Sequence, residues 1–149
     1  MATTKEYHDY VMKCLNKAGE VTSKKMMGGV LPVKFDVAKL KANLSLLPSG
    51  YELKKIDSEL YDKCFENPET VDFVSTFGTK EKYLELGRGV VALKDKKIVA
   101  GASSYTRYKN GIEIEVDTLE SERRNHLATV CCSALISFCR KAYSLKTRF

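Results

Sequence analysis

The apolar residues near the N-terminus recur with a helical period and are followed by a pair of glycines. Thr3 and Glu6 have the spacing of a capping box, and Gly19 is typical of a helix end. The helix predicted between them carries one apolar stripe, formed by Tyr7, Tyr10, Val11, Cys14, Leu15 and Ala18. Residues 20–27 can form a short strand before the glycines interrupt it. One helix and one strand bury too little surface for a core, so we interpret residues 1–29 as an appendage.

Residues 30–48 are interpreted as a connector, after which the pattern becomes that of an α/β protein. Asp36 can cap a short helix within the connector. The segment 51–56 alternates between apolar and polar positions like a strand. Two helices are predicted after it, the first capped by Asp57 and the second by Thr79.

Three antiparallel strands are predicted next, because two turn signals separate three apolar segments. Strands 89–93 and 98–105 flank a polar turn, and an Asn-Gly pair is a strong hairpin signal before the third strand. The third strand, 112–118, alternates strictly, with apolar side chains on one face and acidic ones on the other. A long helix, 124–143, follows with a buried stripe of Leu127, Cys131, Ala134, Leu135, Phe138 and Ala142. This order predicts an α/β (α+β) fold with a mixed, mainly antiparallel sheet and flanking helices.

The composition is typical of one globular domain in a reducing compartment. The 149 residues are 44% hydrophobic and 30% charged, as is usual for soluble domains. No apolar run has membrane-spanning length, and the N-terminus lacks the layout of a secretory signal. Three of the five cysteines lie in the last predicted helix, which argues against a disulfide framework. We therefore expect a cytoplasmic protein with no membrane partner.

The net charge of +6 admits three anionic partners: nucleic acid, a membrane surface or a phosphate-rich cofactor. The lysines are spread along the chain and form no dense block, which argues against a nucleic-acid-binding stripe. A generally basic surface without a role explains the charge equally well. The charge therefore selects no function by itself.

The first 29 residues resemble the opening of the N-terminal domain of the TfoX/Sxy family, a group linked to competence regulation. The resemblance rests on the helix pattern and on the run VTSKKMMG, and it ends at about residue 29. The strands that complete that domain do not follow in this sequence. The resemblance implies one alternative function, a regulatory or interaction protein that acts through this segment.

Most of the remaining chain resembles the GNAT family of N-acetyltransferases. The resemblance begins at LPSGYELKKIDSELYDKC and is clearest in KIVAGASSYTRYKNGIEIEVDTLESERRNHLATVCCSALISFC, so that it spans residues 47–142. It implies a protein that transfers the acetyl group of acetyl-CoA to an amine, which the sequence does not identify. On this interpretation, residues 49–149 form the acetyltransferase core and residues 30–48 connect it to the appendage.

The family hallmark is Arg or Gln, two residues, Gly, one residue, and Gly or Ala at the start of the long helix; here it falls on residues 123–128. The first turn of a helix leaves N–H groups unpaired, and its dipole favours negative charge, so a pyrophosphate fits there. In the family the backbone of the preceding strand pairs with pantetheine. The implied cofactor-binding residues are Val116, Thr118, Arg123, Arg124, Asn125, His126, Leu127 and Ala128. The alternative is a solvated arginine pair on a surface helix.

His126 stands where the family has its hallmark glycine. Its side chain can obstruct the pyrophosphate, or it can swing aside and donate a hydrogen bond to it. A metal site with Cys131 or Cys139 is not expected, because these positions do not share one helix face and their spacing matches no zinc pattern. We expect no metal.

Glu113 and Glu115 are the candidate catalytic residues, because they share one face of the strand before the hallmark. A carboxylate is needed to remove a proton from the attacking amine, directly or through water. In the family the base often lies on this strand. The alternative is that both glutamates simply form the solvent face of a half-buried strand.

In the family a further strand, a helix and a hairpin follow the long helix, whereas here the chain ends at residue 149. We therefore expect a core that lacks the last strands of the family fold, with the strand 112–118 as an open edge and a homodimer through it. The expected function is acetyl-CoA-dependent N-acetyl transfer. The alternative within the same fold is a non-catalytic remnant that binds acyl-CoA or is purely structural.

Overall fold

The computed structural model describes residues 36–108 and 111–143, together with residues 9, 13, 25, 26, 29 and 30. The helix predicted near the N-terminus falls outside this range, except for helical positions at residues 9 and 13. Two short strands, β1 (Lys25–Met26) and β2 (Gly29–Val30), pair with each other in antiparallel orientation. The main body of the fold begins at residue 36.

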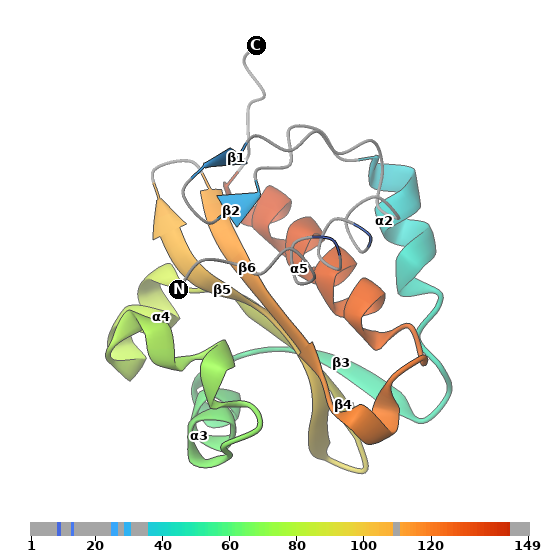
Figure 1. Ribbon diagram of the computed structural model, residues 1–149, viewed down its shortest axis with the longest axis horizontal. Helices are drawn as coiled ribbons and strands as arrows, with labels where there is room; N and C mark the ends of the chain where they lie inside the picture. Colours follow the sequence, from blue (N-terminus) through green and yellow to red (C-terminus); the bar gives the residue numbers. More distant parts are fainter. Residues whose placement is uncertain are drawn as a thin grey trace.

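The centre of the fold is a four-stranded antiparallel sheet in the order β3-β4-β5-β6 (Figure 1). Its strands are β3 (Tyr51–Lys55), β4 (Gly89–Lys94), β5 (Lys97–Tyr108) and β6 (Gly111–Thr118). Asp95 and Lys96 form the turn between β4 and β5 with φ of 49° and 63°, as a two-residue hairpin requires. The mainly antiparallel sheet predicted from the sequence is confirmed.

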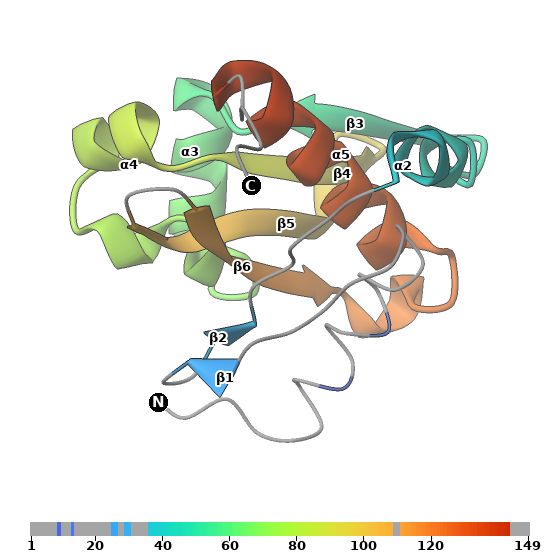
Figure 2. The same cartoon turned by 90° about the horizontal axis from the view of Figure 1, so that it is seen from above.

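Helices cover both faces of this sheet (Figure 2). On one face α5 (Leu127–Tyr143) packs on the strands, and α2 (Val37–Leu44) packs on α5. On the other face lie α3 (Ser58–Glu66) and α4 (Lys80–Leu86). Two short 3-10 helices, η1 (Val71–Phe73) and η2 (Ser75–Phe77), join α3 to α4. The result is a sheet with flanking helices, as the sequence predicted.

Three helices begin at the capping residues that the sequence indicated. The Asp36 carboxylate accepts hydrogen bonds from the amides of Ala38 and Lys39, at 2.9 and 3.2 Å. The Asp57 carboxylate and the Thr79 hydroxyl each accept one bond from the first turn of the helix that follows. Each cap satisfies amides that a helix cannot pair internally, which fixes where the helix starts.

The segment predicted to be a connector contributes a helix to the core. Leu40 of α2 is buried, and the Asn43 side chain donates a buried hydrogen bond of 3.0 Å to the Ser133 hydroxyl of α5. Leu127, Cys131 and Leu135, from the predicted stripe of α5, are also buried. Among the described residues, no helix is both long and apolar enough to cross a bilayer.

The predicted start of the long helix is wrong by three residues. The helix was expected to begin at Arg124, but α5 begins at Leu127. Arg124 and His126 have φ of 67° and 60°, which a right-handed helix cannot contain. The short helix η3 (Glu120–Glu122) and the turn 123–126 therefore separate β6 from α5.

Candidate functional site

The turn 123–126, which leads into α5, contains two residues with a positive φ. Arg124 and His126 are left-handed, whereas Asn125 between them does not have a positive φ. Alternation of backbone handedness turns successive N–H groups toward one point and makes a concavity for an anion. The sequence did not predict this conformation, because the turn contains no glycine, the residue that most readily adopts a positive φ.

The start of α5 adds unpaired amides to this turn. The first bond into the helix runs from the Val130 amide to the His126 carbonyl, at 3.0 Å. The amides of Leu127, Ala128 and Thr129 precede it and have no backbone acceptor within the part of the chain that is described. They point out of the helix at its positive end, where an anion can satisfy both the donors and the dipole.

The three predicted basic residues belong to this turn. Arg123, Arg124 and His126 are all exposed. Neither guanidinium forms an ion pair with any of the described acidic residues. Leu127 is buried in the core and Ala128 is half-buried, so these two can offer a ligand only their backbone.

The last residues of β6 present their backbone at the outer edge of the sheet. The Leu119 amide donates to the Val99 carbonyl at 2.9 Å, and alternate residues of an antiparallel strand face opposite ways. The N–H and C=O groups of Val116 and Thr118 therefore face away from β5. The Asp117 carboxylate accepts the Thr118 amide at 2.7 Å. The Thr118 hydroxyl is buried and has no hydrogen-bond partner among the described residues.

The two candidate glutamates share one face of β6, as predicted, but it is the face opposite α5. Val116 packs in the cluster that contains α5, so Glu113 and Glu115 point to the side of α3 and α4. Glu115 lies opposite Ser103 of β5, whose hydroxyl is 2.8 Å from the Tyr83 hydroxyl of α4. Both glutamates are half-buried. They therefore lie on the other face of the sheet from α5, whose first residue follows the turn 123–126.

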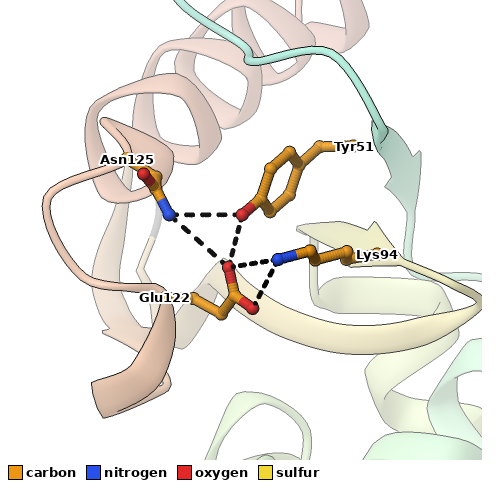
Figure 3. A network of polar contacts seen from close by, with 4 residues as sticks. All are labelled: Tyr51, Lys94, Glu122 and Asn125. Carbon is orange, nitrogen blue, oxygen red and sulfur yellow. Dashed lines mark hydrogen bonds and ion pairs between the residues drawn. The ribbon is translucent and has the colours of Figure 1, made fainter.

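A polar network that the sequence did not predict joins the turn to β3 and β4, the two strands of the sheet that lie away from β6 (Figure 3). The Glu122 carboxylate accepts hydrogen bonds from the hydroxyl of Tyr51, from Lys94 and from the side-chain amide of Asn125. The Tyr51 hydroxyl also accepts a bond of 3.2 Å from Asn125. Because Tyr51 and Glu122 lie 71 residues apart in sequence, no local pattern could reveal their contact.

Electrostatics in this network stabilise the ionised forms of both charged partners. Hydrogen bonds from Tyr51 and Lys94 hold the pKa of Glu122 below its usual value. The bond to Glu122, with a smaller effect of Tyr51, raises the pKa of Lys94. The network is therefore an ion pair with neutral donors around it.

The described cysteines are not placed to act as nucleophiles. Cys64, Cys131 and Cys132 are buried and Cys139 is half-buried, all as free thiols. Burial raises the pKa of Cys64 and of Cys131 to about 12, whereas a nucleophilic cysteine needs a lowered value. In the described part of the chain, no group of three or more His, Cys, Asp or Glu side chains could hold a metal ion.

Comparisons with known proteins assign the fold to a family. The family model described as GNAT acetyltransferase matches residues 1–144, and the chain belongs to this family. It is 32% identical to a GCN5-related N-acetyltransferase-like protein from Streptococcus suis, with a TM-score of 0.73. The alignment covers 93% of this chain and 55% of that protein, so this chain spans about half of its relative.

A weaker likeness is found to an aminoglycoside acetyltransferase from an uncultured soil metagenomic sample. The identity is 16% and the TM-score 0.45, over 64% of this chain and 74% of that one. No curated protein matches the chain. The family model also runs through residues 1–29; the resemblance of that segment to the TfoX/Sxy family stays a prediction.

Proposed function

We propose that this chain binds acetyl-CoA and takes part in the transfer of its acetyl group to an amine. The observation that carries the proposal is the turn 123–126, with unpaired amides at the start of α5 and two exposed arginines beside them. Membership of the GNAT acetyltransferase family supports the same function. The buried, unpartnered Thr118 hydroxyl supports a polar ligand at this end of β6.

In this proposal each part of the site contacts a different part of the cofactor. The amides of Leu127 and Ala128 and the turn around Asn125 and His126 receive the pyrophosphate. Arg123 and Arg124 add charge-assisted hydrogen bonds to its oxygens. The backbone of Val116 and the carbonyl of Thr118 pair with the amide groups of pantetheine, as a neighbouring strand would. In this proposal the cofactor-binding residues predicted from the sequence form one contiguous site.

Acetyl-CoA supplies an acetyl thioester, and the chain must supply a base for the incoming amine. We assign this role to Glu113 and Glu115, which face the side of α3 and α4, so the amine would approach from that side of the sheet. A carboxylate within one water molecule of the amine can accept its proton.

Calorimetry with acetyl-CoA and with free CoA tests the proposal directly. The wild-type chain should bind both, and a ligand that binds the folded state should also raise the melting temperature. An assay of thiol release with a panel of amines then separates an enzyme from a protein that only binds acyl-CoA. Binding without thiol release would favour the non-catalytic alternative, and absence of binding would contradict both.

Replacing Arg123 and Arg124 together with alanine should weaken acetyl-CoA binding by about 2–4 kcal/mol, because two charged hydrogen-bond donors are lost. The matched control replaces Lys39 of α2 and Lys82 of α4, both exposed, with alanine. This control removes the same charge elsewhere and should leave the affinity close to that of the wild type. Equal affinity of the arginine variant and the control would contradict the pyrophosphate assignment.

A further inference from the structure

The turn 123–126 is held by side chains to which the proposed function gives no role. Three donors meet on the Glu122 carboxylate: the Tyr51 hydroxyl, the Lys94 ammonium and the Asn125 amide. Lys94 lies 3.0 Å from one carboxylate oxygen and 3.3 Å from the other. The Glu122 side chain is only 13% exposed, against 43% for Lys94. Glu122 is therefore a largely covered carboxylate that accepts from three donors.

Two of these donors, Tyr51 and Lys94, come from the central sheet. Tyr51 and Lys94 lie directly opposite each other in the β3–β4 pair, so their side chains project from the same face of the sheet. The Lys94 ammonium is also 5.2 Å from the centre of the Tyr51 ring, within the range of a cation–π contact. Since both strands belong to the central sheet, this pair moves with the sheet and not with the loop.

The rest of the network belongs to the loop, where the Glu122 carboxylate accepts and the Asn125 side chain donates. Glu122 is the last residue of η3, and Asn125 lies between the two left-handed residues of the turn. The Asn125 side chain reaches both the Tyr51 hydroxyl and the Glu122 carboxylate, at 3.2 and 3.5 Å. Figure 3 shows these side chains converging between the strand pair and the loop. The network thus joins the turn to the sheet through Asn125 and through Glu122, which directly precedes the turn.

Two left-handed residues that are not glycine need such support. A left-handed conformation costs a residue with a side chain about 1–2 kcal/mol. It persists only where the surroundings hold it in place. The hydrogen bonds that the Asn125 side chain donates to Tyr51 and Glu122 provide that constraint within the turn. Lys94 also offsets the charge of Glu122, which would otherwise oppose an anion near the arginines.

We propose that Tyr51 and Glu122 are positioning residues that preset the turn 123–126 for the pyrophosphate of acetyl-CoA. This inference rests on the proposed function, because it assigns a role in the same site. Neither residue touches the ligand; each acts through Asn125 and the backbone on either side of it. Preorganised donors bind more tightly, because no ordering of the turn remains to be done on binding.

Tyr51→Phe is the cleanest test, since it removes one hydroxyl from the network and changes no charge. We expect the Kd for acetyl-CoA to rise about tenfold at 25 °C, because the loss of one hydrogen bond weakens binding by about that factor. The Kd for 3′-phospho-ADP, the part of CoA that carries the pyrophosphate, should rise by the same factor. Tyr105→Phe is the matched control, because Tyr105 is an exposed tyrosine outside the network; it should bind both ligands like the wild type.

Glu122→Ala separates positioning from simple electrostatics by the sign of its effect. Removing a carboxylate near an anion site should strengthen binding if charge alone matters. Positioning predicts the opposite, weaker binding, with partial recovery in Glu122→Gln because the amide oxygen can still accept hydrogen bonds. Glu120→Ala removes the same charge from an exposed position of η3 and should bind acetyl-CoA as tightly as the wild type or slightly more tightly.

The outcomes distinguish this inference from the function on which it rests. If the wild type binds neither acetyl-CoA nor 3′-phospho-ADP, both proposals are overturned. If the wild type binds and Tyr51→Phe binds equally well, positioning is overturned and the proposed function stands. Positioning is also overturned if the variants only melt at a lower temperature, or if they lose affinity for acetyl-CoA but not for 3′-phospho-ADP.

Discussion

At the scale of single residues, the site depends on backbone conformations that its side chains do not favour. His126 accepts the first hydrogen bond of α5 through its carbonyl while its φ is 60°. Residues that precede a helix usually have extended backbone. The position is therefore one where glycine would fit with less strain, and the histidine side chain remains exposed beside the arginines.

Replacing His126 with glycine should leave stability unchanged or raise it by up to about 1 kcal/mol. Relief of the left-handed strain outweighs the greater freedom of glycine in the unfolded chain. No helix-propensity cost applies, because His126 precedes α5. Ser121→Gly, in η3 and without a positive φ, is the control and should lose about 0.5–1 kcal/mol. Chemical denaturation measures both values.

The same variant tests whether the imidazole obstructs the pyrophosphate or donates to it. We expect His126→Gly to bind acetyl-CoA more tightly, because the backbone of the turn becomes accessible. Calorimetry on the two proteins under one buffer condition is sufficient. Weaker binding by the variant would instead show that the imidazole donates a hydrogen bond to the ligand.

Glu122 should make the stability of the protein sensitive to acid. Its pKa is lowered in the folded state, chiefly by Tyr51 and then by Lys94, so its contribution is present above the pKa of the unfolded chain and is lost as pH falls. At neutral pH the wild type should therefore melt above Glu122→Gln, and the difference should shrink below about pH 4. Glu120→Gln, in the same short helix, is the control. A difference in melting temperature that is constant with pH would contradict the ion pair.

Among the helices and strands, the sequence predicts the features that neighbouring residues decide and misses those that distant residues decide. The caps Asp36, Asp57 and Thr79 were predicted correctly, because a cap is decided by neighbouring residues. The alternation of β6 placed its two glutamates on one face for the same reason. The start of α5 was missed because the left-handed turn has no glycine to mark it. The network around Glu122 could not be predicted, since it joins residues far apart in sequence.

The pairing of α2 with α5 provides a test at this scale. Asn43→Ala removes the donor to the buried Ser133 hydroxyl, so the free energy of unfolding should fall by about 1–3 kcal/mol. Lys41→Ala, at an exposed position of the same helix, should change it by less than about 0.5 kcal/mol. In a cycle with Ser133→Ala, the double variant should lose less than the sum of the single variants. Additive losses would show that the contact contributes nothing to stability.

At the scale of the whole molecule, β6 is an outer strand of the described sheet. The backbone groups of Val116 and the carbonyl of Thr118 face outward and form an edge that another strand could extend, whereas the Thr118 amide donates to the Asp117 carboxylate. We therefore expect the 149-residue chain to self-associate, with a sedimentation coefficient that increases with protein concentration. A monomer that persists at high concentration would contradict this expectation and would suggest that another part of the chain covers β6.

The outer edge of β6 then has two candidate occupants, a second copy of the chain and the pantetheine of acetyl-CoA. A single row of N–H and C=O groups can serve only one of them at a time, so the two equilibria are linked by mass action. Concentrating the protein should weaken its apparent affinity for acetyl-CoA, and adding acetyl-CoA should dissociate the dimer by the same coupling free energy. The cofactor would thus act as a solubilising ligand, and its supply would set the balance between associated and monomeric protein.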